Sequence, residues 1–158
     1  MTREQFILEL KEQQEPLRRF LLTLCNGDAF EADDLAQEAC VKAWISIGSF
    51  RGLSKLSTWL FRIAYNLWCD TKCKRPSCDI ESPEVARQAA GPEADDKFRY
   101  QDLYIAISLL SPSERAAILL FYMEDKSIKE ISSIMGMPAG TIKSLLSRGR
   151  TKLKIKLK

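Results

Sequence analysis

"SIKEISSIMGMPAGTIKSLLSRGR", residues 127–150, is the stretch from which the fold is predicted. Its first four residues form a capping box, in which Ser127 and Glu130 satisfy backbone groups at the start of a helix near residue 128. Gly136 suits the left-handed conformation that ends a helix, and Pro138 suits the beginning of the next one. Two short helices joined by a turn that contains glycine predict a helix-turn-helix.

The second of these helices has an apolar side and a polar side when it is drawn on a helical wheel. The polar side combines small hydroxyls with long cations, which suits base edges and phosphates in the major groove of DNA. An amphipathic helix with a solvated polar face is the alternative. The residues predicted to be buried are Ile142, Leu145, Leu146, Gly149 and Leu153.

Charge is divided unevenly along the chain. No acidic residue follows Glu130, so residues 131–158 carry a net charge of +7. Because the whole chain has a net charge of +3, residues 1–130 carry −4. A polyanion is the natural partner of such a basic segment. A solvated lysine-rich tail would explain Lys154 to Lys158 alone.

The residue composition argues against an enzyme and against a cofactor. The chain contains no histidine, which excludes Ser-His-Asp and Cys-His catalysis and every metal site that needs histidine. It also lacks a glycine-rich phosphate loop. Cys69, Cys73 and Cys78 do not have the paired spacing of a zinc site, so no metal is predicted, and Cys40 and Cys69 fit better as small core residues.

The chain is expected to be a cytoplasmic protein with reduced thiols. Its five cysteines are an odd number, and the N-terminal sequence "MTREQFILEL" has no apolar run of the signal-peptide type. The longest apolar run, residues 116–123, is too short to span a bilayer, so no membrane insertion is predicted.

The fold is predicted to be all-α, with two small helical domains joined by a flexible acidic linker. The domains are residues 1–77 and 98–158, and a second capping box, Ser111 to Glu114, starts a helix near residue 112. The linker is residues 78–97, and within it residues 79–96 contain six acidic residues and one arginine with few large apolar residues. We therefore expect the two domains to move independently or to pack through a weak interface.

Three motifs in this order resemble the sigma-70 family, and most closely its extracytoplasmic-function (ECF) group. "DDLAQEACVKAW" and "SFRGLSKLSTWLFRIAYN" resemble region 2, and the stretch quoted first resembles region 4. The resemblance implies a specificity subunit, not itself an enzyme, that directs core RNA polymerase to promoters and helps to melt them. The implied partners are core polymerase with its β′ clamp helices, promoter DNA and an anti-sigma factor.

The resemblance also assigns roles to residues. Gln37 and Glu38 match the helix that docks on the clamp helices, and the exposed face of that helix mixes polar with apolar residues, as partner surfaces do. Asn66, beside aromatics and cations, suits the edges of unpaired bases. Polymerase binding is assigned to Asp34, Gln37, Glu38, Val41 and Lys42; the −10 element to Arg51, Ser54, Lys55, Trp59, Arg62, Asn66 and Asp70; the −35 element to Thr141, Lys143, Ser144, Ser147, Arg148 and Arg150.

Four positions depart from the pattern of many ECF members. Leu145 stands in place of an arginine, Ser147 stands near the place of an aromatic residue or a cation, Phe121 in place of another arginine, and Leu53 in place of an acidic residue. The −35 contacts are therefore expected to be fewer. Two other functions stay open, namely a stand-alone helix-turn-helix regulator and a nucleic-acid enzyme with a cysteine metal site.

Overall fold

The computed structural model describes residues 2–50, 52, 55–74 and 94–156. The helices are α1 (Arg3–Leu24), α2 (Ala29–Ile45), the 3₁₀-helix η1 (Ile47–Ser49), α3 (Leu56–Lys74), α5 (Ala94–Ser108), α6 (Pro112–Ile118), the π-helical turn η2 (Leu119–Met123), α7 (Ile128–Met135) and α8 (Ala139–Lys156). Within these ranges there is no strand, and the predicted all-α class is confirmed.

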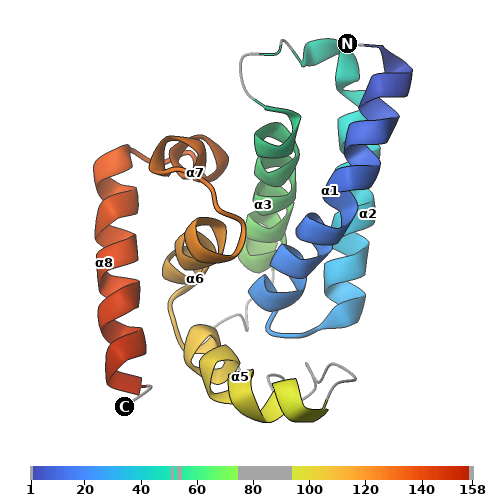
Figure 1. Ribbon diagram of the computed structural model, residues 1–158. Helices are drawn as coiled ribbons and strands as arrows, with labels where there is room; N and C mark the ends of the chain where they lie inside the picture. The colour runs from blue at the N-terminus through green and yellow to red at the C-terminus, as the bar shows by residue number, and fades with distance from the viewer. Residues whose placement is uncertain (1, 51, 53–54, 75–93, 157–158) are drawn as a thin grey trace.

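Helices α1, α2 and α3 form a three-helix N-terminal unit (Figure 1). A capping box between Thr2 and Gln5 starts α1. The chain reverses through Asn26 and Gly27, both with positive φ, and Asp28 then caps α2. Small residues on α2 allow the large side chains of α1 and α3 to pack closely against it. The buried residues include Phe6, Leu17, Phe20, Leu24, Ala32, Ala39, Ala43, Leu60, Phe61, Ala64, Leu67 and Trp68.

Helices α5 to α8 form the C-terminal unit. The starts of α6 and α7 and the end of α7 lie where the sequence predicts them. Both predicted capping boxes are present, from Ser111 and from Ser127. Gly136 ends α7 with φ of 66°, in the left-handed region where glycine is favoured. Pro138 lies just before α8, and its carbonyl accepts a hydrogen bond from the Ile142 amide at 3.1 Å. The predicted helix-turn-helix is therefore α7, the turn at Gly136, and α8.

The two units pack against each other, with α7 and η2 of the C-terminal unit against α3 and α1 (Figure 1). Across this junction the Arg19 guanidinium donates to both carboxylate oxygens of Glu124, at 2.9 and 3.1 Å. The Thr58 hydroxyl donates to Glu130 at 3.2 Å. The Lys126 ammonium also donates to the Ser57 hydroxyl, at 3.2 Å. The sequence left open whether the units would separate or pack. In the structure they pack through these polar contacts and through a hydrophobic cluster whose buried residues come from both units.

A buried arginine completes the junction. Arg115, at the start of α6, is fully buried and donates to the Leu24 carbonyl at the end of α1, at 3.0 Å. Carbonyls at a helix C-terminus lack partners inside the helix, so the guanidinium supplies a donor that α1 needs. Its other donors reach the carbonyls of Ile107, Ser108 and Leu110. One side chain thus ties α1 to the C-terminal end of α5 and to the turn that follows it.

Helix α5 begins at Ala94, so the last four residues of the predicted linker are helical. The remainder of that linker before Ala94 and the boundary at residue 77 lie outside the described residues. In the part of the chain that the structure describes, no helix combines the length and the apolar character needed to cross a bilayer.

Candidate nucleic-acid and protein interfaces

Helix α8 presents the polar side that its sequence predicted. The apolar residues Ile142, Leu145 and Leu146 are buried and Leu153 is partly buried. The helix forms the outer edge of the C-terminal unit, away from α3 (Figure 1). All six residues predicted to contact DNA are exposed: Thr141, Lys143, Ser144, Ser147, Arg148 and Arg150. A helix fixed by one face, with hydroxyls and cations on the other, can enter a major groove.

The close approach of α8 to α6 depends on Gly149. A Cβ atom at this position would lie 2.8 Å from Ile118 Cγ1, closer than real contacts allow. On either side of this crossing, α8 is held by polar contacts: Lys152 donates to Glu114 at 2.7 Å, and Arg150 donates to the Tyr122 hydroxyl at 3.2 Å. The helix is therefore fixed in rotation as well as in distance.

Glu114 is almost fully buried beneath α8, where its carboxylate faces several donors. Burial raises the pKa of this carboxyl, but hydrogen bonds from Lys152 and from the Ser111 amide outweigh burial and hold the pKa below its ordinary value. The Arg148 Nε lies 3.8 Å from the second carboxylate oxygen. Glu114 therefore carries its negative charge and pairs with two cations of α8.

Two hydroxyls of α8 bond to their own helix. Ser144 donates to the Gly140 carbonyl at 3.1 Å, and Thr151 donates to the Ser147 carbonyl at 3.0 Å. Each hydroxyl has a single proton, so these side chains offer only acceptor lone pairs to a ligand. In a major groove, acceptors suit the amino groups of adenine and cytosine.

Helix α3 separates a core face from an exposed face as predicted. Arg62, Asn66 and Asp70 are exposed along one side, and Lys55 is exposed just before the helix begins. Trp59 is half-buried, because its ring packs against Phe50 with centroids 5.1 Å apart. The exposed row brings an amide, cations and an aromatic edge together, as a surface for unpaired bases requires. The other two predicted residues, Arg51 and Ser54, lie outside the described residues.

The third predicted surface lies on α2. Its five assigned residues, Asp34, Gln37, Glu38, Val41 and Lys42, are all exposed. A groove of about 470 Å³ runs between α1 and α2, lined by Gln14, Arg18, Asp33, Ala36, Gln37, Cys40 and Val41. Exposed apolar side chains beside polar ones are typical of a partner surface.

Sequence reasoning missed one member of the α2 surface. Phe30 is 91% exposed in the first turn of α2. It precedes Asp34, Gln37 and Val41 by four, seven and eleven residues, so it shares their face. This helical spacing could have identified Phe30 from the sequence as a member of the α2 surface. Ile45, 74% exposed, continues the same face by one further turn.

Comparison with known proteins decides the family. The models for Sigma-70 region 2 and for Sigma-70, region 4 match residues 10–75 and 100–153. The chain is 32% identical over 146 residues to the ECF RNA polymerase sigma factor SigW of Bacillus subtilis (strain 168), which covers 84% of this chain and 78% of that protein. The chain belongs to the ECF group of the sigma-70 family.

Two further similarities cover most of this ECF chain. It is 32% identical to the ECF RNA polymerase sigma factor EcfG of Rhodopseudomonas palustris (strain TIE-1), over 87% of this chain and 76% of that one. Among solved structures it resembles the sigma factor RpoE from Bartonella quintana, crystallised with the anti-sigma factor NepR. The TM-score is 0.84 at 33% identity, with coverage of 98% and 97% of the two chains. The family predicted from the three motifs is confirmed.

The departures from the ECF pattern have a structural meaning. Leu145, at the position where the resemblance implied an arginine, is buried against the C-terminal core, so in this chain the position faces inward. Phe121 is partly buried in η2 and packs edge-on against Tyr122, with centroids 4.9 Å apart. Leu53 lies outside the described residues.

The cysteines of this ECF chain carry no described metal cluster. Cys25 is buried, Cys40 and Cys69 are partly buried, and across the described residues no three potential metal ligands gather. Burial raises the pKa of the Cys25 thiol well above its ordinary range. The predicted core role fits Cys40 and Cys69, which are partly buried against the core. Cys78 and the side chain of Cys73 lie outside what the structure describes.

Proposed function

We propose that the chain is an ECF-type sigma factor that directs core RNA polymerase to promoters and assists promoter melting. One observation supports this most directly: a single chain exposes a basic helix suited to duplex DNA on α8, a row suited to unpaired bases on α3, and a partner face on α2. Such a protein binds core polymerase and promoter DNA and positions one on the other, and it catalyses no reaction of its own. Its place of action is the cytoplasm, where its polymerase works.

In this proposal α8 reads the −35 element as duplex. Lys143, Arg148 and Arg150 supply the cations, with Arg148 oriented toward base edges and the others toward phosphates. Thr141, Ser144 and Ser147 complete the surface. The basic C-terminal end of α8 adds attraction that depends on salt concentration.

The −10 element is read on α3 after the duplex opens. Extruding a base costs a few kcal/mol of stacking and pairing, and contacts available only to the extruded base offset part of that cost. Asn66 is placed to read the base edge and the cations Lys55 and Arg62 to hold the backbone. The same role is proposed for Arg51, Ser54, Trp59 and Asp70.

Core polymerase is proposed to bind α2 through its clamp helices. The Gln37–Glu38 pair supplies polar contacts, while Phe30, Val41 and Ile45 supply apolar area. These side chains are already exposed, so the surface needs no rearrangement within the N-terminal unit.

Promoter binding requires the two units to separate. The −10 and −35 elements are named for positions about 25 base pairs apart, or roughly 85 Å at about 3.4 Å per pair. A folded chain of this length has a radius of gyration of only about 15 Å. The packed arrangement therefore cannot reach both elements, and polymerase holds the units apart so that the second contact becomes intramolecular. The packed arrangement is also the form that an anti-sigma factor would recognise.

Run-off transcription with purified core polymerase tests the proposal. Specific transcripts are expected only when both the chain and core polymerase are present. Gln37→Ala combined with Glu38→Ala should reduce holoenzyme formation without changing the circular dichroism spectrum, because both side chains are exposed. Tight, sequence-specific binding by the free chain without polymerase would instead support a stand-alone regulator, and nuclease or transferase activity would support an enzyme.

A further inference from the structure

The burial and the ionic contacts of Glu114 are not explained by its role in the capping box of α6. Its Oε1 accepts a hydrogen bond from the Ser111 amide at 3.2 Å, and this is the usual contact of a glutamate at the third position of a helix. Such a residue is commonly solvated, yet here the side chain is only 5% exposed. The same carboxylate faces α8, where Lys152 and Arg148 approach it. The burial and the two additional cations have no part in capping α6.

The two cations stand in different relations to Glu114. Lys152 Nζ is 2.7 Å from Oε1, a short charge-assisted hydrogen bond that compensates the buried negative charge. Arg148 Nε is 3.8 Å from Oε2, close enough for attraction but too far for a hydrogen bond. Since its side chain is 60% exposed, the outer edge of the Arg148 guanidinium remains available to a ligand.

The backbone holds this geometry in place. Gly149 directly follows Arg148, and its missing Cβ allows α8 to lie against Ile118. A Cβ atom at position 149 would lie 4.0 Å from the Glu114 Cβ, so Glu114 begins directly beneath this part of α8. The carboxylate is therefore at a fixed distance below Arg148. Lys143, one helical turn and a half earlier, is exposed with no carboxylate partner among the described residues.

A guanidinium that reads a base needs orientation. Arginine recognises guanine by donating two parallel hydrogen bonds to O6 and N7, and the planar fork must be aimed for both to form. A carboxylate facing Nε leaves the two terminal nitrogens pointing outward as a pair. Phosphate contacts need no such alignment, because they carry no sequence information.

We propose that Glu114 is a positioning residue for promoter selectivity: it aims the Arg148 guanidinium at a guanine of the −35 element, while Lys152 neutralises its charge. The inference rests on the proposed function and extends it to a buried residue outside the helix-turn-helix. Arg148 is then the base-reading cation of α8, and Lys143 is a phosphate contact.

The test measures transcription by holoenzyme on a promoter library randomised through the −35 element. Glu114→Gln keeps the shape and the acceptor for Ser111 but removes the charge that aims Arg148. A bidentate contact gives roughly 5- to 150-fold discrimination against a wrong base. We expect Glu114→Gln to lower discrimination about tenfold at the base pair where Arg148→Ala also lowers it, and nowhere else. In the double variant, discrimination should be no lower than with Arg148→Ala alone.

Three controls separate aiming from folding. Ser111→Ala removes the cap of α6 without removing either cation, so it should leave the base preference unchanged. Lys143→Ala should weaken all promoters alike and add to the effect of Glu114→Gln. If Glu114→Gln lowers the helical content, Glu114→Asp keeps the charge and withdraws it by one methylene group, and it should give an intermediate loss at the same base pair.

The outcomes of this experiment distinguish a failure of the positioning role from a failure of the proposed function. A holoenzyme that prefers one −35 sequence, and prefers it equally with Glu114→Gln, overturns the positioning role alone. Additive losses of discrimination from Glu114→Gln and Arg148→Ala would overturn it as well. A core polymerase that transcribes no promoter specifically with the unaltered chain overturns the proposed function itself.

Discussion

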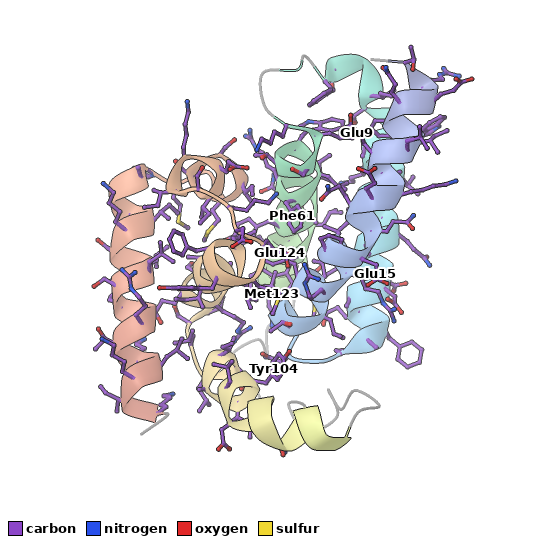
Figure 2. The ribbon with its side chains drawn as sticks, viewed as in Figure 1. Glu9, Glu15, Phe61, Tyr104, Met123 and Glu124 are labelled. Atoms are coloured by element: carbon purple, nitrogen blue, oxygen red, sulfur yellow. The ribbon has the colours of Figure 1, made fainter. Side chains whose placement is uncertain are left out.

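Removing one arginine should release the packed arrangement of the two units. Glu124 has a side chain only 3% exposed, and both of its oxygens accept hydrogen bonds from Arg19 of the other unit. Figure 2 labels Glu124 near the middle of the molecule, between the two units. With Arg19→Ala, Glu124 stays desolvated and unpaired in the packed form but becomes hydrated when the units separate. The substitution therefore penalises packing and not the folding of either unit.

The size of the effect follows from the geometry. Losing a charged partner of a buried group costs about 1.5–3 kcal/mol per hydrogen bond. Arg19 is half exposed, so solvent screening reduces the worth of two such bonds to about 2 kcal/mol in total. At about 1.4 kcal/mol per tenfold change, this shifts the equilibrium between packed and separated forms by roughly 30-fold.

Core polymerase binding measures that shift. If polymerase binds only the separated form, the apparent dissociation constant falls in proportion as that form becomes more populated. Titration of labelled chain with core polymerase should therefore show affinity rising by up to about 30-fold for Arg19→Ala. Lys11→Ala should bring no gain, because Lys11 is an exposed cation of α1 that makes no ion pair among the described residues. An unchanged affinity for Arg19→Ala would refute the requirement that the units separate.

Three other predictions concern folding and reactivity. Gly149→Ala should destabilise the chain by about 1–3 kcal/mol in thermal melts, because the added methyl overlaps Ile118. Cys25 should resist alkylation at pH 8, since burial raises its thiol pKa, and the half-buried Cys40 should be modified before Cys25 in peptide mass mapping. Burial raises the pKa of the Glu130 carboxyl, but hydrogen bonds from Ser127 and Thr58 outweigh burial and hold this pKa below its ordinary value. Its stabilising contribution is present above about pH 4.3, the unfolded value, and is lost as pH falls through the lower folded value. Glu130→Gln should flatten acid denaturation curves there.

Local features of the fold were predictable because their causes are local. The capping boxes at Ser111 and Ser127 and the glycine at 136 each involve residues within a few positions of one another. Helical spacing then assigned the buried faces of α3 and α8. The exposure of the candidate site residues followed from the same wheels, since a face that is not apolar has no reason to be buried.

The junction between the units was not predictable, because its partners lie far apart in the sequence. Arg19 and Glu124 are separated by 105 positions, and neither has a neighbouring pattern that marks it. Arg115 reads in sequence as a solvated residue in the first turn of a helix, yet it is fully buried among carbonyls. Glu114 was recognised as a cap, but its contact with Arg148 depends on how α8 crosses α6. The Arg19–Glu124 pair, the burial of Arg115 and the Glu114–Arg148 contact all depend on tertiary packing.

The acceptors of Arg115 have a consequence for which positions of the chain can vary. The carbonyls of Leu24, Ile107, Ser108 and Leu110 belong to the main chain, so they remain when any of these side chains is replaced. Replacing Arg115 itself would instead leave the buried Leu24 carbonyl without this donor. Evolutionary constraint from these hydrogen bonds therefore falls on the arginine codon, while the acceptor positions are constrained by packing and not by the bonds they accept.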